Sequence, residues 1–135
     1  MTLKELSQLY YLNREINYDR ERLGKLRGAV LSFPPTTGGS TVSGGDKPSK
    51  VEKLTAEIVD LENEISDKIL ESIRERKKIE LYISGICDSR IRIIFKLRFI
   101  DCLSWTAVAY KMGGGNTAES VKKMCYRFLK NEKLG

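Results

Sequence analysis

Residues 88–133 read DSRIRIIFKLRFIDCLSWTAVAYKMGGGNTAESVKKMCYRFLKNEK and hold the clearest structural pattern in the chain. Apolar residues recur there at intervals of three and four, the spacing of one face of a helix, in three successive groups. Short polar or glycine-rich segments separate the groups. The pattern therefore predicts three helices joined by turns.

Residues that cap or break helices mark the ends of these three helices. Asp88-Ser89 begins the first, and Ser104 and Thr117 cap the second and third, because side-chain oxygens accept hydrogen bonds from free backbone N–H groups. The second ends at residues 113–116, Gly-Gly-Gly-Asn, because glycine adopts the left-handed conformations that a helix exit needs. The residues expected to face inward are Ile91, Ile94, Phe95, Leu97, Ile100, Trp105, Val108, Ala109, Met112, Val121, Met124, Cys125, Phe128 and Leu129.

The net charge of +6 lies entirely in this last part of the chain. Residues 1–84 carry 14 basic and 14 acidic residues, whereas residues 85–135 carry 10 basic and 4 acidic residues. A basic surface attracts phosphates and releases their counterions. Three short helices with a basic last helix therefore predict a helix-turn-helix that binds double-stranded DNA.

The third predicted helix supplies the candidate DNA-binding residues. In helix-turn-helix proteins the first half of this helix meets base edges, and later positions hold phosphates. Glu119 is suited to accept a hydrogen bond from cytosine, and Lys122 or Lys123 is suited to donate one to guanine. The alternative for Glu119 is that it only stabilises the helix dipole. The alternative for the lysines is that they only form a solvated helix face. The full set is Thr117, Glu119, Ser120, Lys122, Lys123, Tyr126, Arg127 and Lys130.

Other residues of this segment have two open interpretations. The basic residues of the first helix either touch the DNA backbone or only solvate that helix: Arg90, Arg92, Lys96 and Arg98. Trp105 is expected to fill the core between the three helices, as large aromatic residues do in small cores, with base stacking as the alternative. Residues 113–117 lack the Gly-Lys-Ser/Thr ending of a nucleotide-binding loop, so a tight turn is expected.

The remainder of the chain predicts two long helices, at residues 2–31 and 50–84. The second, capped by Ser49, has an apolar seam with the alternating steps of a coiled coil. Residues 32–50 between them are rich in proline, glycine and serine and are expected to be a disordered linker. The seam residues are Leu3, Leu6, Leu9 or Tyr10, Ile16, Leu23, Leu26 and Val30 in the first helix, and Val51, Leu54, Ile58, Leu61, Ile65, Ile69, Ile73, Ile79 and Ile83 in the second.

These elements predict an all-α protein in two domains. Residues 1–84 form a long antiparallel helical hairpin or coiled coil, and residues 85–135 form the helix-turn-helix domain. A coiled coil between two chains is the alternative to pairing within one chain, and both arrangements are compatible because a two-helix hairpin leaves apolar surface for a partner. A homo-oligomer formed through the N-terminal helices is therefore one expectation.

Composition argues against several classes of protein. The chain has no histidine, the commonest general base, and no enzymatic activity is expected. Its three cysteines have no metal-binding spacing and are expected to be reduced thiols, so no metal or other cofactor is expected. No apolar run is long enough to span a bilayer, and the N-terminus is not signal-like; a cytoplasmic protein is expected.

Residues 97–105, LRFIDCLSW, followed by Val108-Ala109, resemble region four of bacterial sigma factors. Over nearly its whole length the chain resembles the ArpU-type late transcription regulators of phages and prophages of Gram-positive bacteria, most specifically at residues 113–117 and 120–123. Cys102 stands where sigma factors usually have glycine, and Ala107 where an acidic residue is common. The resemblance implies phage-encoded control of transcription in a bacterial host, with RNA polymerase as a further partner.

Two other functions fit the same pattern. A DNA-packaging protein such as a phage small terminase subunit also joins a helix-turn-helix to helical oligomerisation segments, and it forms a ring of defined stoichiometry. A sigma-like interaction module that has lost DNA binding would bind no duplex even at low salt.

Overall fold

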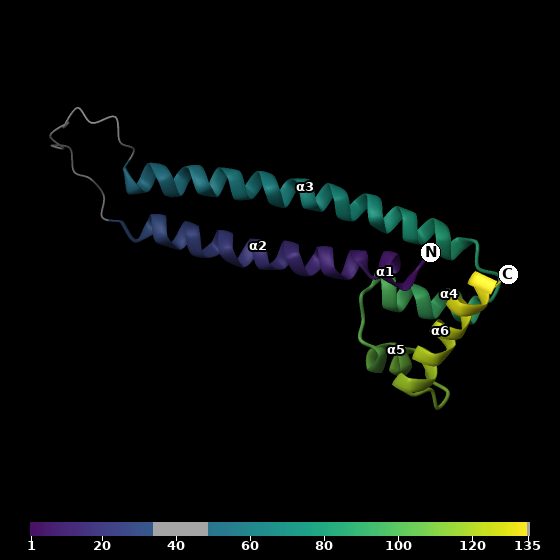
Figure 1. Cartoon of the computed structure of the whole chain (residues 1–135). Coiled ribbons are helices and arrows are strands. Elements are labelled where there is room, and N and C mark those ends of the chain that lie inside the picture. The colour runs from purple at the N-terminus through teal and green to yellow at the C-terminus, as the bar shows by residue number, and fades with distance from the viewer. Residues whose placement is uncertain (34–48, 135) are drawn as a thin grey trace, which may run out of the picture. The chain divides into compact units, whose positions relative to one another are not determined.

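The computed structural model describes residues 1–33 and 49–134, and every regular element among them is a helix (Figure 1). The predicted all-α class is confirmed. Most of the expected linker, residues 34–48, lies outside the described residues. The elements are α1 (Leu3–Leu6), α2 (Gln8–Leu31), α3 (Lys50–Ser84), α4 (Ser89–Phe95), the π-helical segment η1 (Lys96–Ile100), α5 (Trp105–Met112) and α6 (Ala118–Leu134).

Side-chain caps fix where the helices begin, largely as the sequence predicts. Asp88 accepts hydrogen bonds from the backbone of Arg90 and Ile91 at the start of α4. At the start of α3, Ser49 and Glu52 each accept a hydrogen bond from the other's backbone N–H.

The helix predicted over residues 2–31 is interrupted at Ser7, whose hydroxyl donates a hydrogen bond to the Leu3 carbonyl at 2.8 Å. Such a bond to position i−4 slightly weakens a helix and often bends it, although Thr55 makes the same bond to Val51 within the continuous α3.

The described chain divides into two compact units, residues 1–13 with 71–135, and residues 14–70. This division differs from the boundary expected after residue 84. The reason is that the ends of both long helices pack into the same core as the C-terminal helices. Leu6 and Leu9 from the N-terminal helices, and Ile79 and Ile83 from α3, are buried together with Phe95 and Val121. The boundary at residues 84 and 85 stays a prediction about independent folding.

Aromatic rings organise the core of the first unit around the fully buried Phe95. Phe99 and Phe128 contact it edge-on, at centroid distances of 5.2 and 5.4 Å, and Tyr82 stacks on it at 6.4 Å. Within this unit α6 packs against α4 and α5, and α5 packs against η1. The short helices therefore share one core, which holds α6 in place.

The second unit pairs residues 14–31 of α2 with residues 50–70 of α3, which lie side by side in Figure 1. Asp19 bonds Lys68 at 2.5 Å, and Arg27 bonds Glu62 at 2.8 Å. From the first pair to the second, the residue number rises along α2 and falls along α3. The two helices of the chain therefore pack antiparallel to each other. The buried residues between the two helices are Leu23, Leu61 and Ile65.

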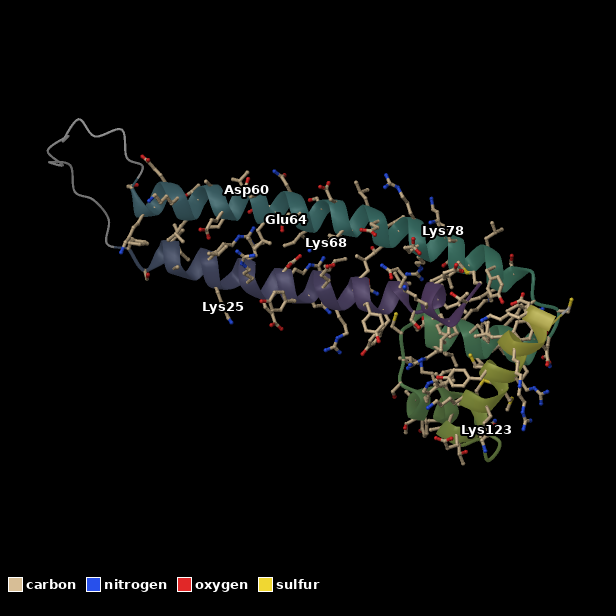
Figure 2. The ribbon with its side chains drawn as sticks, viewed as in Figure 1. Lys25, Asp60, Glu64, Lys68, Lys78 and Lys123 are labelled. Carbon is tan, nitrogen blue, oxygen red and sulfur yellow. The ribbon has the colours of Figure 1, made fainter. Side chains whose placement is uncertain are left out.

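The buried seam departs from the predicted one at several positions. Val51, Ile73 and Leu3 are exposed rather than buried. At the level of Ile73 the half-buried position is the neighbouring Ser72, because the coiled-coil steps drift around the helix after Ile65. In α2 the seam also includes Leu12 and a carboxylate, Asp19, which is only 6% exposed. Figure 2 shows its partner Lys68 on α3.

Candidate nucleic-acid interface

The last helix, α6, has one face in the core and one face in solvent. Val121, Cys125 and Leu129 are buried at spacings of four, and Met124 and Phe128 pack beside them. Positions displaced around the helix from this stripe carry the basic side chains. Lys123, Arg127 and Lys130 are exposed, and Figure 2 shows Lys123 on α6. The arrangement presents a row of cations on an element whose position is set by packing.

The turn between η1 and α5 depends on an unusual backbone conformation. Cys102 has φ +57°, the only positive φ of a non-glycine residue among those described. The Leu103 amide then donates to the Leu97 carbonyl at 3.1 Å, and Ser104 accepts from the Ala107 amide at 3.2 Å. The predicted cap of the second helix is therefore present, and the turn before it bends through a left-handed residue.

The predicted glycine turn between α5 and α6 is also present. The φ angles of Gly113, Gly114 and Gly115 are +66°, +61° and +77°. A residue with a side chain would be strained in this conformation. Thr117 and Ser120 then cap α6 reciprocally. The Ser120 amide donates to Thr117 Oγ1 at 3.1 Å, and the Thr117 amide donates to Ser120 Oγ at 2.8 Å. Both hydroxyls are therefore occupied in starting the helix, which orients the residues that follow.

All eight predicted site residues lie at the surface. Ser120 and Lys122 are half-buried, and the other six are exposed: Thr117, Glu119, Lys123, Tyr126, Arg127 and Lys130. The structure brings them together along the outer side of α6 and its N-terminal cap. Whether they contact a nucleic acid stays a prediction.

A chain of cation–aromatic contacts supports the half-buried Lys122. Its ammonium nitrogen lies 5.8 Å from the ring centroid of Tyr126, which meets Trp105 edge-on at 6.3 Å. The guanidinium carbon of Arg98 lies 4.6 Å from the Trp105 centroid. Such contacts contribute roughly 0.5–1 kcal/mol each at exposed sites. Trp105 is thus half-buried and covers the core, rather than filling its interior as expected.

Two of the four basic residues on the first of these helices have roles that the sequence does not reveal. Arg98 donates to the Leu103 carbonyl at 2.8 Å. Arg92 donates to the carbonyls of Ile86 and Cys87 and to the Ser89 hydroxyl. Each guanidinium ties down a loop within this unit, a role that neither of the two sequence interpretations included. Arg98 and Arg92 are therefore poor candidates for direct phosphate contacts, whereas Lys96 stays exposed.

The three cysteines lie at different depths, with Cys87 exposed, Cys102 half-buried and Cys125 buried. Cys125 lies in the core, where burial raises the pKa of its thiol to about 12 and keeps it neutral. Burial also raises the pKa of the Cys102 thiol. Within residues 1–33 and 49–134, no three acidic or cysteine side chains gather as metal ligands would. In the same ranges, no helix has an apolar stretch that would reach across a bilayer.

Comparison with known proteins places the chain in one family. It belongs to the family described as "Protein of unknown function (DUF1492)", whose model matches residues 31–130. That match includes α3 and almost all of the C-terminal helices. No curated protein and no solved structure matches the chain.

Proposed function

We propose that this member of the DUF1492 family binds double-stranded DNA, with α5 and α6 as a helix-turn-helix and α6 as the recognition helix. One observation carries the proposal: α6 is anchored by a buried stripe while Lys123, Arg127 and Lys130 stay exposed along its outer side. A rigid helix with free cations suits the major groove of a duplex. Glu119 and Lys123 precede Arg127 and Lys130, so the former are assigned to base edges and the latter to phosphates.

The backbone at Cys102 supports the sigma-like part of this proposal. Glycine is usual at this position in region four of sigma factors, and glycine readily adopts positive φ. Cys102 has φ +57°, so the turn keeps a glycine-like conformation although the side chain differs. This observation favours a region-four-like turn, and with it the relation to ArpU-type phage regulators. Control of transcription in a bacterial cytoplasm, with RNA polymerase as a second partner, follows as part of the same proposal.

The direct test is binding to duplex DNA with a matched pair of lysine variants. Selection from a random duplex pool supplies a preferred sequence, and fluorescence anisotropy over a salt series gives its affinity. Lys123→Gln is expected to weaken binding about 5- to 150-fold, because a specific base contact contributes about 1–3 kcal/mol. A phosphate contact would instead change the salt slope by about one without changing sequence preference. Lys25→Gln removes the same charge from an exposed position on α2 and is expected to leave affinity nearly unchanged.

The outcomes separate the competing functions. No duplex binding by the wild-type chain at low salt would contradict the proposal and favour an interaction module. Binding accompanied by a ring of defined stoichiometry would favour a packaging protein. A monomer or dimer that protects one short site would favour a transcription regulator.

A further inference from the structure

We infer that the N-terminal turn of the chain forms a second part of the DNA-binding surface, where it holds a phosphodiester segment beside α6. The inference rests on the proposed DNA-binding function and extends it to residues outside the helix-turn-helix. A groove of about 240 Å³ lies between the two ends of the chain. Its lining residues are Thr2, Leu3, Tyr126, Leu129, Lys130 and Lys133.

The charges in this groove fit a phosphate backbone. Lys130 and Lys133 are three residues apart and therefore share one side of α6. Both are exposed, and neither has an ion pair within the described part of the chain. Among the described lining residues there is no carboxylate to neutralise them. Two free ammonium groups at the edge of one groove favour a polyanion as its occupant.

The apolar surface of the groove fits the sugar that joins two phosphates. Leu3 is 39% exposed and Tyr126 is 40% exposed, and the buried Leu129 also lines the groove. A mixed lining of cations and apolar carbon is suited to alternating phosphate and deoxyribose. Tyr126 also takes part in the contacts with Lys122 and Trp105, so the groove is continuous with the candidate interface.

The fold fixes the N-terminal turn against α6. Leu6, one turn after Leu3, is fully buried in the same core as Cys125 and Leu129. Thr2 and Glu5 cap each other's backbone at 3.1 and 3.2 Å and thereby order the first residues. The groove is therefore built by packing and capping.

The test introduces a positive, a neutral or a negative side chain at Leu3, which has no role in a helix-turn-helix alone. Fluorescence anisotropy on the selected duplex compares the affinities of Leu3→Lys, Leu3→Gln and Leu3→Glu. Circular dichroism and Trp105 fluorescence check that each variant is folded. We expect affinity to decrease in the order Lys, Gln, Glu, with about a tenfold span, since gain or loss of one phosphate contact changes affinity several-fold at moderate salt. Lys133→Gln is expected to reduce the salt slope by about 0.9 without changing sequence preference.

A matched control separates a local contact from general attraction. Leu81 on α3 is 75% exposed, and the same three substitutions there change net charge by the same amounts. Charges more than about 8 Å from the DNA are largely screened at 0.15 M salt, so the Leu81 series is expected to vary less than about twofold. If the Leu3 series varies no more than the Leu81 series while Lys123→Gln still weakens binding, the second surface is refuted and the recognition helix stands. If the wild-type chain binds no duplex, both proposals fail.

Discussion

At the scale of single residues, Cys102 has the most demanding backbone in the described chain. Its φ of +57° places a side chain where glycine is preferred, and a left-handed conformation costs roughly 1–2 kcal/mol for an L-residue. A weak hydrogen bond from the Asn13 side-chain amide to the Cys102 sulfur, 3.8 Å long, offsets a small part of this cost. The local sequence Asp-Cys-Leu-Ser predicted a turn here. These residues did not indicate which position would take positive φ, and the only pointer to Cys102 was the glycine that sigma factors usually have there.

Substitutions at Cys102 are expected to follow backbone preference rather than side-chain size. The free energy of unfolding of Cys102→Gly should lie within about 1 kcal/mol of the wild-type value. The relief of backbone strain should offset the loss of side-chain contacts and the greater flexibility of the unfolded chain. Cys102→Val should destabilise the protein by about 2 kcal/mol or more, because a β-branched residue tolerates positive φ worst. Thermal unfolding monitored by circular dichroism measures both, with Cys87→Val at an exposed position as the control. Equal destabilisation by valine at both positions would contradict the assigned strain.

At the scale of elements, helix ends were predictable, whereas the contacts between helices were not. Ser49, Asp88, Ser104 and Thr117 act through hydrogen bonds to residues two or three positions away, and such short spacings are visible in the sequence. Asp19 could not be recognised as buried, because its partner Lys68 lies 49 positions away. The roles of Arg92 and Arg98 were hidden for a different reason: apart from the Ser89 hydroxyl, their acceptors are backbone carbonyls, which carry no residue-specific signal.

The pair of Asp19 and Lys68 is expected to set the register of α2 against α3. Asp19 is nearly buried, whereas the Lys68 side chain is 25% exposed and also lies 3.7 Å from Glu15. The hydrogen bond with Asp19 raises the pKa of Lys68 above 10.5. A raised lysine pKa means that the stabilisation is complete at neutral pH and is lost as pH rises through that higher value.

A double-mutant cycle tests this pair. Asp19→Ala is expected to cost about 1–2 kcal/mol of unfolding free energy, less than for a fully buried pair because Lys68 can reach water. Lys68→Ala and the double variant Asp19→Ala with Lys68→Ala complete the cycle, and the double variant should lose less stability than the sum of the two single losses. Arg27→Ala, which breaks the exposed pair with Glu62, should cost no more than about 0.5 kcal/mol. Purely additive effects of Asp19 and Lys68 substitutions would refute the coupling.

At the scale of the whole molecule, the core of the C-terminal helices is completed by residues from the other end of the sequence. The stripes of α4, α5 and α6 were predictable from their periodicity, and so were the exposed cations of α6. The participation of α1 and of the end of α3 was not, because a helical stripe does not say which element will cover it. The groove at Leu3 and Lys133 follows from the same long-range packing, although the spacing of Lys133 after Lys130 was visible in the sequence.

This shared core predicts that a change in α1 will loosen the proposed DNA-binding helices. Leu6 is fully buried in the core that contains Phe95 and Val121, and replacing a buried leucine by alanine typically costs about 2–5 kcal/mol. Trp105 is the only tryptophan of the chain, so its fluorescence reports unfolding around α5. Leu6→Ala should therefore lower the denaturant midpoint seen by Trp105, although the two residues are far apart in sequence. Leu31→Ala, at a position 85% exposed, should leave that midpoint unchanged. An unchanged Trp105 transition in Leu6→Ala would instead show that residues 85–135 fold without the N-terminal helix, as a domain boundary at residues 84 and 85 requires.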